Sequence, residues 1–217
     1  SDWGSAPLDF VEYVTTGGDD KNYVFTLRED PLIGHALKQG FMYDLSTLSC
    51  LDFTEDKYKR NKVHEQYSVG GKIYAMYGGY SEPRGGIYFN KRLLKEAGID
   101  PESIYDMQEN GTWTWQTWTD MMQKVQRDVD NDGSIDIWGF DANYHVPLLA
   151  AIYSNNGEIV GMENGKYIYE IEMPNSVEAM EWFVDCMNQY ALVRPEDTMW
   201  DYYTESFVKG ECVFLPD

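Results

Sequence analysis

The sequence predicts an α/β protein. Short runs of β-branched and aromatic residues alternate along the chain with segments in which apolar residues recur every three or four positions. Glycine, proline and asparagine, which are typical of turns and helix ends, lie between these segments. With 217 residues, of which 43% are hydrophobic and 25% charged, the chain has the length and composition of one large globular domain or two small ones.

Three strands and two helices are expected in the first half of the chain. The strands are residues 23–27, 72–76 and 86–89. The helix over residues 31–39 has a proline suited to its first turn and Gly40 suited to its end. The helix over residues 90–97 ends at Gly98. Residues 100–112 are expected to form a polar connector.

The second half contains the clearest helical pattern, which begins after Thr114, a residue suited to cap a helix. Its apolar face consists of Trp115, Trp118, Met121, Met122 and Val125, and the two tryptophans are expected in the core. Further helices are expected over residues 143–153, 175–190 and 198–209, and strands over 137–140 and 212–215. The helix over 175–190 is expected to bury Met180, Phe183, Val184 and Met187.

Charge excludes one class of partner. Seventeen lysine and arginine residues against 37 aspartate and glutamate residues give a formal net charge of -20. Such a surface repels the phosphates of nucleic acids, so no nucleic-acid partner is expected.

The three cysteines, Cys50, Cys186 and Cys212, form no CxxC pair and are expected to be inert thiols. Neither a Ser-His-Asp pattern, a phosphate loop nor a metal-hydrolase motif is present, which favours a protein without catalytic residues.

Aromatic residues suggest a kind of ligand. They make up 15% of the chain and include 17 tyrosines and 7 tryptophans. Many of them are expected in the core, but an aromatic ring at the surface is also a flat apolar platform. Such platforms on an acidic protein suit the stacking of neutral, hydroxyl-rich molecules.

Three segments, in this order, resemble one family. They are Gln39–Leu45, then Gly70–Tyr74 with Gly86–Lys91, and finally Thr114–Trp115 followed by the acidic stretch 128–136 and Trp138–Phe140. Together they resemble the extracellular solute-binding proteins of carbohydrate ABC importers (family 1 type), over roughly residues 23–215. The resemblance implies an α/β, two-lobed type II periplasmic-binding-protein-like fold. Because a full member is about twice as long, we expect this chain to be a central, incomplete fragment.

The resemblance also implies an organisation and a function. Residues 1–109 would belong to a partial lobe 1, residues 110–208 to lobe 2, and residues 209–217 to a strand crossing back toward lobe 1. A sugar or oligosaccharide would bind in the cleft between the lobes without chemistry and without any required cofactor. The partners would be the carbohydrate and the membrane permease subunits of an ABC transporter, and the protein would be a monomer. Its location would be extracellular or in the cell envelope, with a lipid anchor in the full-length protein.

Position within the resemblance selects twelve ligand contacts. They are Arg28, Glu29, Asp30, Tyr77, Tyr80, Glu82, Arg84, Asp141, Asn143, Tyr144, Trp200 and Tyr202. The first triplet follows an expected strand, where α/β sheets place ligands, but it would equally cap the next helix. The four contacts from residues 77–84 occupy a glycine-rich loop that would otherwise be an exposed turn. Trp200, Tyr202 and the adjacent Tyr203 cannot all face one side of a helix, so at least one is expected to be exposed.

An acidic loop resembles a calcium loop of the EF-hand type. Its oxygen ligands would be Asp128, Asp130, Asp132, Ser134 and Asp136, with Gly133 at the sharp turn. The twelfth position, which is normally a bidentate glutamate, is Gly139. The pattern is therefore equally compatible with a structural calcium ion and with a solvated acidic turn.

Two other functions remain open from the residues alone. A secreted carbohydrate-active enzyme, such as a fragment of a glycoside hydrolase, needs two carboxyl groups at a fixed separation, which is a three-dimensional property. A calcium-dependent adhesion module would use the acidic loop. Turnover of chromogenic glycosides would distinguish the enzyme from the binding protein.

Overall fold

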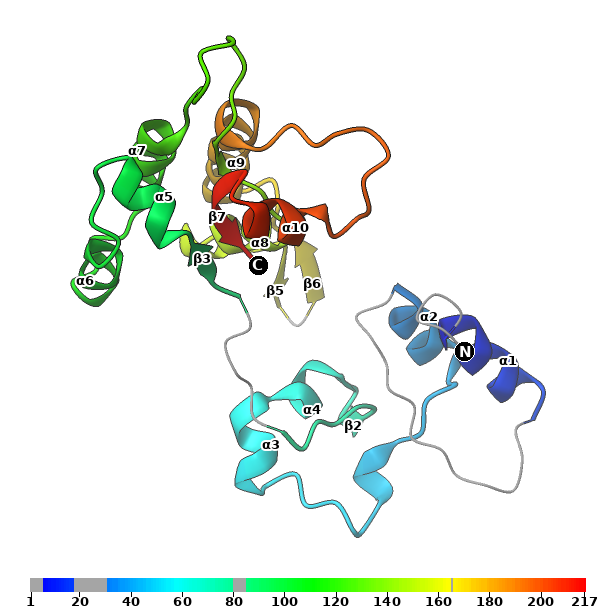
Figure 1. The fold of residues 1–217 in the computed structure, drawn as a ribbon. Helices are drawn as coiled ribbons and strands as arrows, with labels where there is room; N and C mark the ends of the chain where they lie inside the picture. The colour runs from blue at the N-terminus through cyan, green and yellow to red at the C-terminus, as the bar shows by residue number, and fades with distance from the viewer. Residues whose placement is uncertain (1–5, 18–30, 80–84, 165) are drawn as a thin grey trace. The chain divides into compact units, whose positions relative to one another are not determined.

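The computed structural model describes residues 6–17, 31–79, 85–164 and 166–217 (Figure 1). The chain forms two compact units, Ser1–Glu82 and Pro83–Asp217. The lobe boundaries expected at residues 109 and 208 stay predictions. Within the described ranges, no helix has both the length and the apolar character needed to cross a bilayer.

The first unit consists of short elements. They are α1 (Ala6–Thr15), α2 (Pro31–Gln39), η1 (Leu45–Thr47), α3 (Asp56–Asn61), α4 (Val63–Gln66) and the hairpin of β1 (Ser68–Val69) and β2 (Lys72–Ile73). Helix α2 confirms the expected helix, whereas α1 was not expected. The strand predicted over 72–76 is only two residues long, and the strand predicted over 23–27 lies outside the described residues.

Polar side chains tie these elements together. Asp44 caps η1 by accepting a hydrogen bond from the Ser46 N–H at 3.1 Å, and it also accepts one from the Ile73 N–H at 3.3 Å. Asn61 donates to the backbone carbonyls of Tyr77 and Gly79 at 2.7 and 2.9 Å. These contacts hold irregular backbone in place where no long helix or sheet does so.

The second unit is built on a mixed three-stranded sheet. Its order is β3 (Ile87–Phe89), β7 (Cys212–Pro216) and β4 (Trp138–Phe140). The central strand β7 is antiparallel to β3 and parallel to β4, with Phe214 opposite both Phe89 and Phe140. All five residues of β7 are buried, as expected for a strand with neighbours on both sides. The terminal strand predicted over 212–215 is thus confirmed.

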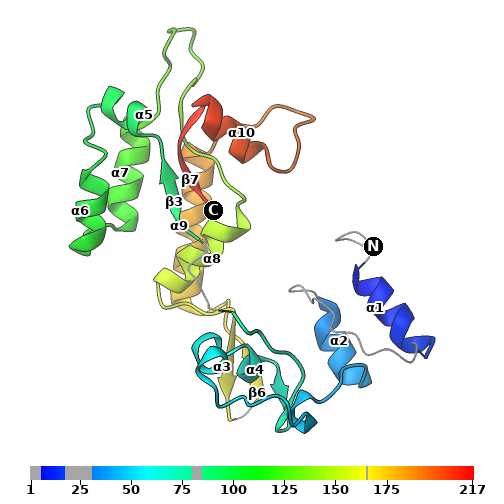
Figure 2. The same ribbon diagram turned by 60° about the horizontal axis from the view of Figure 1, so that its bottom comes forward.

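Six helices and a hairpin complete the described part of this unit. They are α5 (Lys91–Glu96), α6 (Ser103–Glu109), α7 (Trp115–Val125), α8 (His145–Ser154), α9 (Pro174–Tyr190), α10 (Tyr202–Lys209) and the antiparallel pair β5 (Val160–Glu163) and β6 (Lys166–Tyr169). Figures 1 and 2 show α5, α6 and α7 grouped on one side of β3 and β7, with α10 on the other. The core joins these elements through Leu93, Met122, Phe140, Phe183 and Phe214.

Most expected helices are present, with two differences in extent. Residues 100–112 are not only a polar connector, because α6 forms there and buries Ile104 in the core. The last helix begins at Tyr202 rather than at residue 198. Helix α7 matches its prediction: Thr114 and Thr117 form a reciprocal capping box, and the buried face includes Trp118. Trp115 packs at the edge of the core by stacking on Trp182, with ring centroids 4.5 Å apart.

The buried face of α9 differs from the prediction. Ser176, Ala179, Phe183 and Cys186 are buried, at spacings of three and four residues. Val184, which was expected in the core, is 50% exposed because it lies about 100° around the helix from Phe183. Met180 and Met187 pack against the core at its margin.

Candidate functional site

The carboxyl ends of the two parallel strands bring polar residues together. Asp141 directly follows β4 and Asp217 directly follows β7. The Asp141 N–H donates to the Phe214 carbonyl at 3.2 Å, which holds this strand end against β7. This edge is where open α/β sheets commonly place their ligands.

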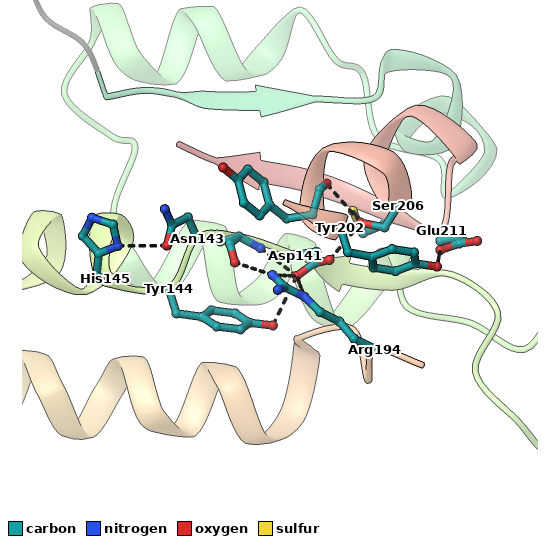
Figure 3. Close-up of polar contacts among 11 residues, drawn as sticks. Asp141, Asn143, Tyr144, His145, Arg194, Tyr202, Ser206 and Glu211 are labelled. Carbon is teal, nitrogen blue, oxygen red and sulfur yellow. Dashed lines mark hydrogen bonds and ion pairs between the residues drawn. The ribbon is translucent and has the colours of Figure 1, made fainter. Parts of the chain in front are cut away.

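Asp141 is fully buried, and both of its carboxylate oxygens accept hydrogen bonds (Figure 3). Its Oδ1 accepts from the Ala142 N–H at 2.9 Å, from the Tyr144 hydroxyl at 3.2 Å, and from Nε and Nη2 of Arg194 at 3.0 and 2.7 Å. Its Oδ2 accepts from the Ser206 hydroxyl at 2.9 Å. The N–H groups of Ala142 and Arg194 can only donate, so Oδ1 acts as an acceptor toward both residues.

The backbone places Arg194 beside this carboxylate. The Leu192 N–H donates to the Phe140 carbonyl at 2.9 Å, so the segment after α9 runs alongside β4. Arg194 Nη2 also donates to the Ala142 carbonyl at 2.6 Å. Burial alone would lower the pKa of Arg194, but the hydrogen bonds and charge of Asp141 outweigh it and raise the pKa. The arginine therefore stays charged while 23% of its side chain remains exposed.

Two tyrosine rings adjoin the guanidinium, and a tryptophan adjoins one of these rings. Its central carbon lies 5.2 Å from the ring centroid of Tyr144 and 5.7 Å from that of Tyr203. Both distances are within the range of cation–π contacts. Trp200 lies edge-on to Tyr203 at 6.3 Å and is 70% exposed. We call Asp141, Tyr144, Arg194, Trp200 and Tyr203 the Arg194 site.

Tyrosine ionisation at this site is suppressed. Burial, followed by the charge of Asp141, raises the pKa of Tyr144 to about 12. Burial and the charges of Asp217 and Asp201 raise the pKa of Tyr203, while a side-chain hydrogen bond with Asn143 acts in the opposite direction. At neutral pH both hydroxyls are consequently protonated, and they can donate or accept hydrogen bonds.

Two other predicted ligand contacts of the second unit, Asn143 and Tyr202, have different surroundings. Asn143 is half-buried, and its Oδ1 lies 2.8 Å from Nδ1 of the exposed His145. Tyr202 is buried, and its hydroxyl donates to Glu211 at 2.9 Å (Figure 3). Tyr202 therefore points to a different partner from its neighbour Tyr203, as successive helical residues must. The ligand-contact roles of Asn143 and Tyr202 stay predictions.

A further group of predicted contacts comes from residues 28–84, on both sides of the boundary between the two units. Arg28, Glu29, Asp30, Tyr80, Glu82 and Arg84 lie outside the described residues. Tyr77 is described and is 46% exposed, and its carbonyl accepts the hydrogen bond from Asn61. Its role as a ligand contact stays a prediction.

The acidic loop precedes β4. Asp128, Asp130 and Asp136 each offer a carboxylate oxygen, and these oxygens lie within 4.8 Å of one another. Asp128 accepts from the N–H groups of Asn131 and Gly133 at 2.7 and 2.8 Å, and the bond from Gly133 contributes most to lowering its pKa. Three carboxylates so close suit a hard cation such as Ca²⁺.

The other two expected calcium ligands of this loop, Asp132 and Ser134, are not part of the carboxylate cluster. Asp132 and Ser134 are exposed, and the Ser134 N–H donates to the Asp132 carboxylate at 2.7 Å. The twelfth position, Gly139, lies in β4, where a Cβ would meet Tyr190 and Met122 at 2.9 and 3.0 Å. Packing thus excludes a bidentate glutamate there, and calcium binding stays a prediction.

A surface hollow of about 610 Å³ lies elsewhere on the second unit. It is lined by Tyr153, Asn156, Gly157, Glu158, Ile159 and Val160, at the end of α8 and the start of β5. None of the predicted ligand contacts lines it. The hollow therefore shares no lining residue with the Arg194 site.

Sequence reasoning missed two residues of this network. Arg194 and Ser206 hold Asp141 from positions 53 and 65 residues further along the chain. Neither lies in a recognisable motif. Tyr203 belonged to a noted aromatic cluster, and the exposure expected for at least one member is found at Trp200.

Solved structures share this fold. An ABC substrate-binding protein of Listeria monocytogenes in complex with cycloalternan has a TM-score of 0.60 at 17% identity, over 100% of this chain and 52% of that one. The GacH receptor of Streptomyces glaucescens, solved unliganded and with acarbose, has a TM-score of 0.60 at 15% identity, over 100% and 50%. The maltose-maltodextrin binding protein of Alicyclobacillus acidocaldarius has a TM-score of 0.57 at 18% identity, over 100% and 50%.

No protein-family profile matches the sequence. The chain spans about half the length of the three solved proteins, and all three are described as binding proteins or receptors. At these levels of identity the likeness concerns the fold. The chain has the α/β fold of type II periplasmic binding proteins, as found in the sugar-binding components of ABC transporters.

Proposed function

We propose that this chain is part of the solute-binding subunit of a sugar ABC transporter and binds a carbohydrate without altering it. The observation that carries the proposal is the Arg194 site at the carboxyl ends of β4 and β7. There an anchored guanidinium is flanked by two tyrosine rings, with an exposed tryptophan beside them. The fold shared with sugar-binding proteins supports the same conclusion.

The chemistry of a sugar matches this arrangement. Its C–H faces stack on aromatic rings, and its hydroxyls accept and donate hydrogen bonds. Trp200 and Tyr203 offer ring surface, while Arg194 and the tyrosine hydroxyls offer polar groups. Leaving such polar groups unpaired penalises a ligand that lacks the matching hydroxyl, which gives selectivity.

Binding without catalysis agrees with the state of Asp141. A glycosidase needs an accessible acid and a second carboxyl group across the scissile bond. Asp141 is fully buried and already accepts hydrogen bonds from four residues, so it is unsuited to proton transfer. We therefore expect no turnover of chromogenic glycosides.

The biological setting follows from the same proposal. A transporter subunit of this kind acts outside the cytoplasmic membrane and delivers its ligand to permease subunits. We propose an extracellular or cell-envelope location with a lipid anchor in the full-length protein, and a monomeric state. The acidic loop would hold a structural calcium ion away from the sugar.

The experiment is a thermal-shift and calorimetric screen of maltotriose, cellotriose, mannotriose and galactobiose. We expect at least one sugar to bind, and Trp200→Ala to weaken that binding roughly tenfold through loss of a stacking surface. Tyr167→Ala is the matched control, since Tyr167 is 69% exposed on β6 and is not part of the Arg194 site. The proposal is contradicted if none of these sugars binds, or if both variants bind alike.

A further inference from the structure

Arg194 has donor capacity that the fold does not use. Its Nε and Nη2 bond to Asp141, and Nη2 also bonds to the Ala142 carbonyl. Among the described residues, no hydrogen bond is formed by Nη1, and the side chain is 23% exposed. A guanidinium carries five N–H donors in a rigid plane, so the free ones have a fixed direction.

Neighbouring side chains fix the orientation of the Arg194 guanidinium. The Asp141 carboxylate bonds one edge of the guanidinium, and the rings of Tyr144 and Tyr203 lie 5.2 and 5.7 Å from it. Ser206 in turn bonds the other oxygen of Asp141 at 2.9 Å. A ligand that binds here meets a donor whose conformational freedom was already lost on folding, which favours affinity.

The charges around this donor are not favourable to an anion. Asp141 compensates the single positive charge of Arg194 at 2.7 Å. Asp201 and Asp217 lie close enough to Tyr203 for their charges to act on it, and the whole chain carries a formal charge of -20. An acidic ligand would approach a site whose local field is negative, whereas a neutral ligand would use only its hydrogen-bonding groups.

We propose that Arg194 is the donor by which the site recognises a neutral, hydroxyl-bearing sugar, and that Asp141 is a positioning residue that also excludes acidic sugars by neutralising Arg194. This inference rests on the proposed function and deepens it. It reassigns Asp141, which was expected to contact the ligand itself. The ligand-contacting atom is Nη1 of Arg194, and Asp141 acts through the arginine.

The test compares one neutral sugar with its own uronate. The probe is the tightest-binding sugar among maltotriose, cellotriose, mannotriose and galactobiose, together with the same sugar oxidised at a primary hydroxyl. For the unsubstituted chain, we expect the uronate to bind at least tenfold more weakly by calorimetry. Equal or tighter binding of the uronate overturns the inference and leaves the proposed sugar-binding function intact.

Asp141→Asn isolates the neutralising charge. It keeps an acceptor near Arg194 but leaves the guanidinium charge uncompensated, so the ratio of uronate to neutral-sugar Kd should fall roughly tenfold. A purely structural role would weaken both sugars together and leave this ratio unchanged. Asp185→Asn is the control, because it makes the same change in net charge at an exposed position on α9. An unchanged ratio in the first variant, or an equal fall in both, overturns the inference.

Arg194→Lys tests the donor while preserving the ion pair. Lysine keeps the positive charge that Asp141 requires but lacks the planar fork, so the neutral sugar should bind about tenfold more weakly. Circular dichroism and a thermal melt establish that the variant is folded. If the folded variant binds the neutral sugar as tightly as before, Arg194 is not the donor. If no neutral sugar binds even the unsubstituted chain, the proposed function fails, and this inference fails with it.

Discussion

The carboxylate of Asp141 is fully buried, whereas the guanidinium of Arg194, 2.7 Å away, keeps 23% of its side-chain surface in solvent. Loss of the ion pair should therefore cost more when the arginine is removed than when the carboxylate is removed. An arginine that loses its partner can still be hydrated. A carboxylate that loses its arginine stays buried, and only the Ala142 N–H and two hydroxyls remain to bond it.

Removing either partner should show this asymmetry. We expect Arg194→Met to lower the free energy of unfolding by about 3–5 kcal/mol, because it leaves a buried charge uncompensated. Asp141→Asn should cost about half as much, since the amide still accepts a hydrogen bond and the arginine reaches solvent. Urea denaturation measures both values.

A surface pair provides the control for these variants. Lys209 and Glu205 form an ion pair on α10 in which both side chains are about half exposed. Lys209→Met should change the stability by less than about 1 kcal/mol. Equal effects of Arg194→Met and Asp141→Asn would show that the buried position of the carboxylate does not govern the energetics.

Elements with a strong local pattern were predictable from the sequence. Helix α7 has a threonine cap and apolar residues at helical spacing, and both features were found. Helix α6 was missed because its seven residues bury only Ile104, which leaves almost no periodic pattern. Val184 was misplaced because the strip of apolar residues on α9 is wide, and tertiary packing rather than periodicity decides which edge faces the core.

The candidate site was predictable only in part. Asp141 and Tyr144 were selected by their position within the family resemblance, and they lie just after the end of β4. What Asp141 does there depends on Arg194, which is 53 residues away in the chain. Only the parallel alignment of the chain after α9 with β4 brings the two together, and this pairing leaves no pattern in the local sequence.

We expect Cys50 to react with thiol reagents much faster than Cys186 and Cys212. Cys50 is exposed, whereas Cys186 and Cys212 are buried. Burial raises the pKa of Cys186 to about 11 and that of Cys212 to about 12, so neither forms the reactive thiolate near neutral pH. A thiol-specific chromogenic reagent at pH 8 should label Cys50 alone in the folded chain and all three residues in urea. Rapid labelling of Cys212 under native conditions would contradict this expectation.

The raised pKa of Cys212 predicts a loss of folding stability at alkaline pH. The pKa of Cys212 is raised from 9.0 in the unfolded chain to about 12 in the folded one. The unfolded chain therefore releases this proton first, and the stabilising contribution, present in full below pH 9, is lost as the pH rises toward 12. Melting temperatures between pH 7 and 11 should fall less steeply for Cys212→Ala than for the unsubstituted chain. Parallel curves would remove Cys212 as a cause.

Two glycines should respond differently to an added methyl group. At Gly139 in β4, a Cβ would meet Tyr190 Cβ at 2.9 Å and Met122 Cβ at 3.0 Å. These atoms belong to packed side chains near their backbone, so Gly139→Ala should destabilise the fold by about 1–3 kcal/mol. At Gly161 in β5, the three atoms nearest to the added Cβ all belong to the carboxylate end of Glu170, which can move aside. Gly161→Ala should thus be nearly neutral in the same urea assay, and a larger effect there than at Gly139 would refute the packing argument.

Calcium binding to the acidic loop is the remaining prediction. The oxygens of Asp128, Asp130 and Asp136 lie within 4.8 Å of one another before any ion binds, and backbone N–H groups already order the loop. Since the bidentate ligand at the twelfth position is absent, we expect a weak site with a Kd of about 0.1–1 mM. At 10 mM Ca²⁺ such a site would add roughly 1.4–2.7 kcal/mol to the free energy of unfolding.

Calorimetric titration and thermal melts with and without 10 mM Ca²⁺ check this expectation. Asp130→Asn removes one of the three clustered carboxylates and should abolish the calcium-dependent rise in melting temperature. Asp185→Asn removes an equal charge from exposed α9 and should preserve the rise, which separates specific ligation from general screening of a chain with a net charge of -20. A titration without heat, together with an unchanged melting temperature, would mean that the loop is a solvated acidic turn closed by its own backbone hydrogen bonds.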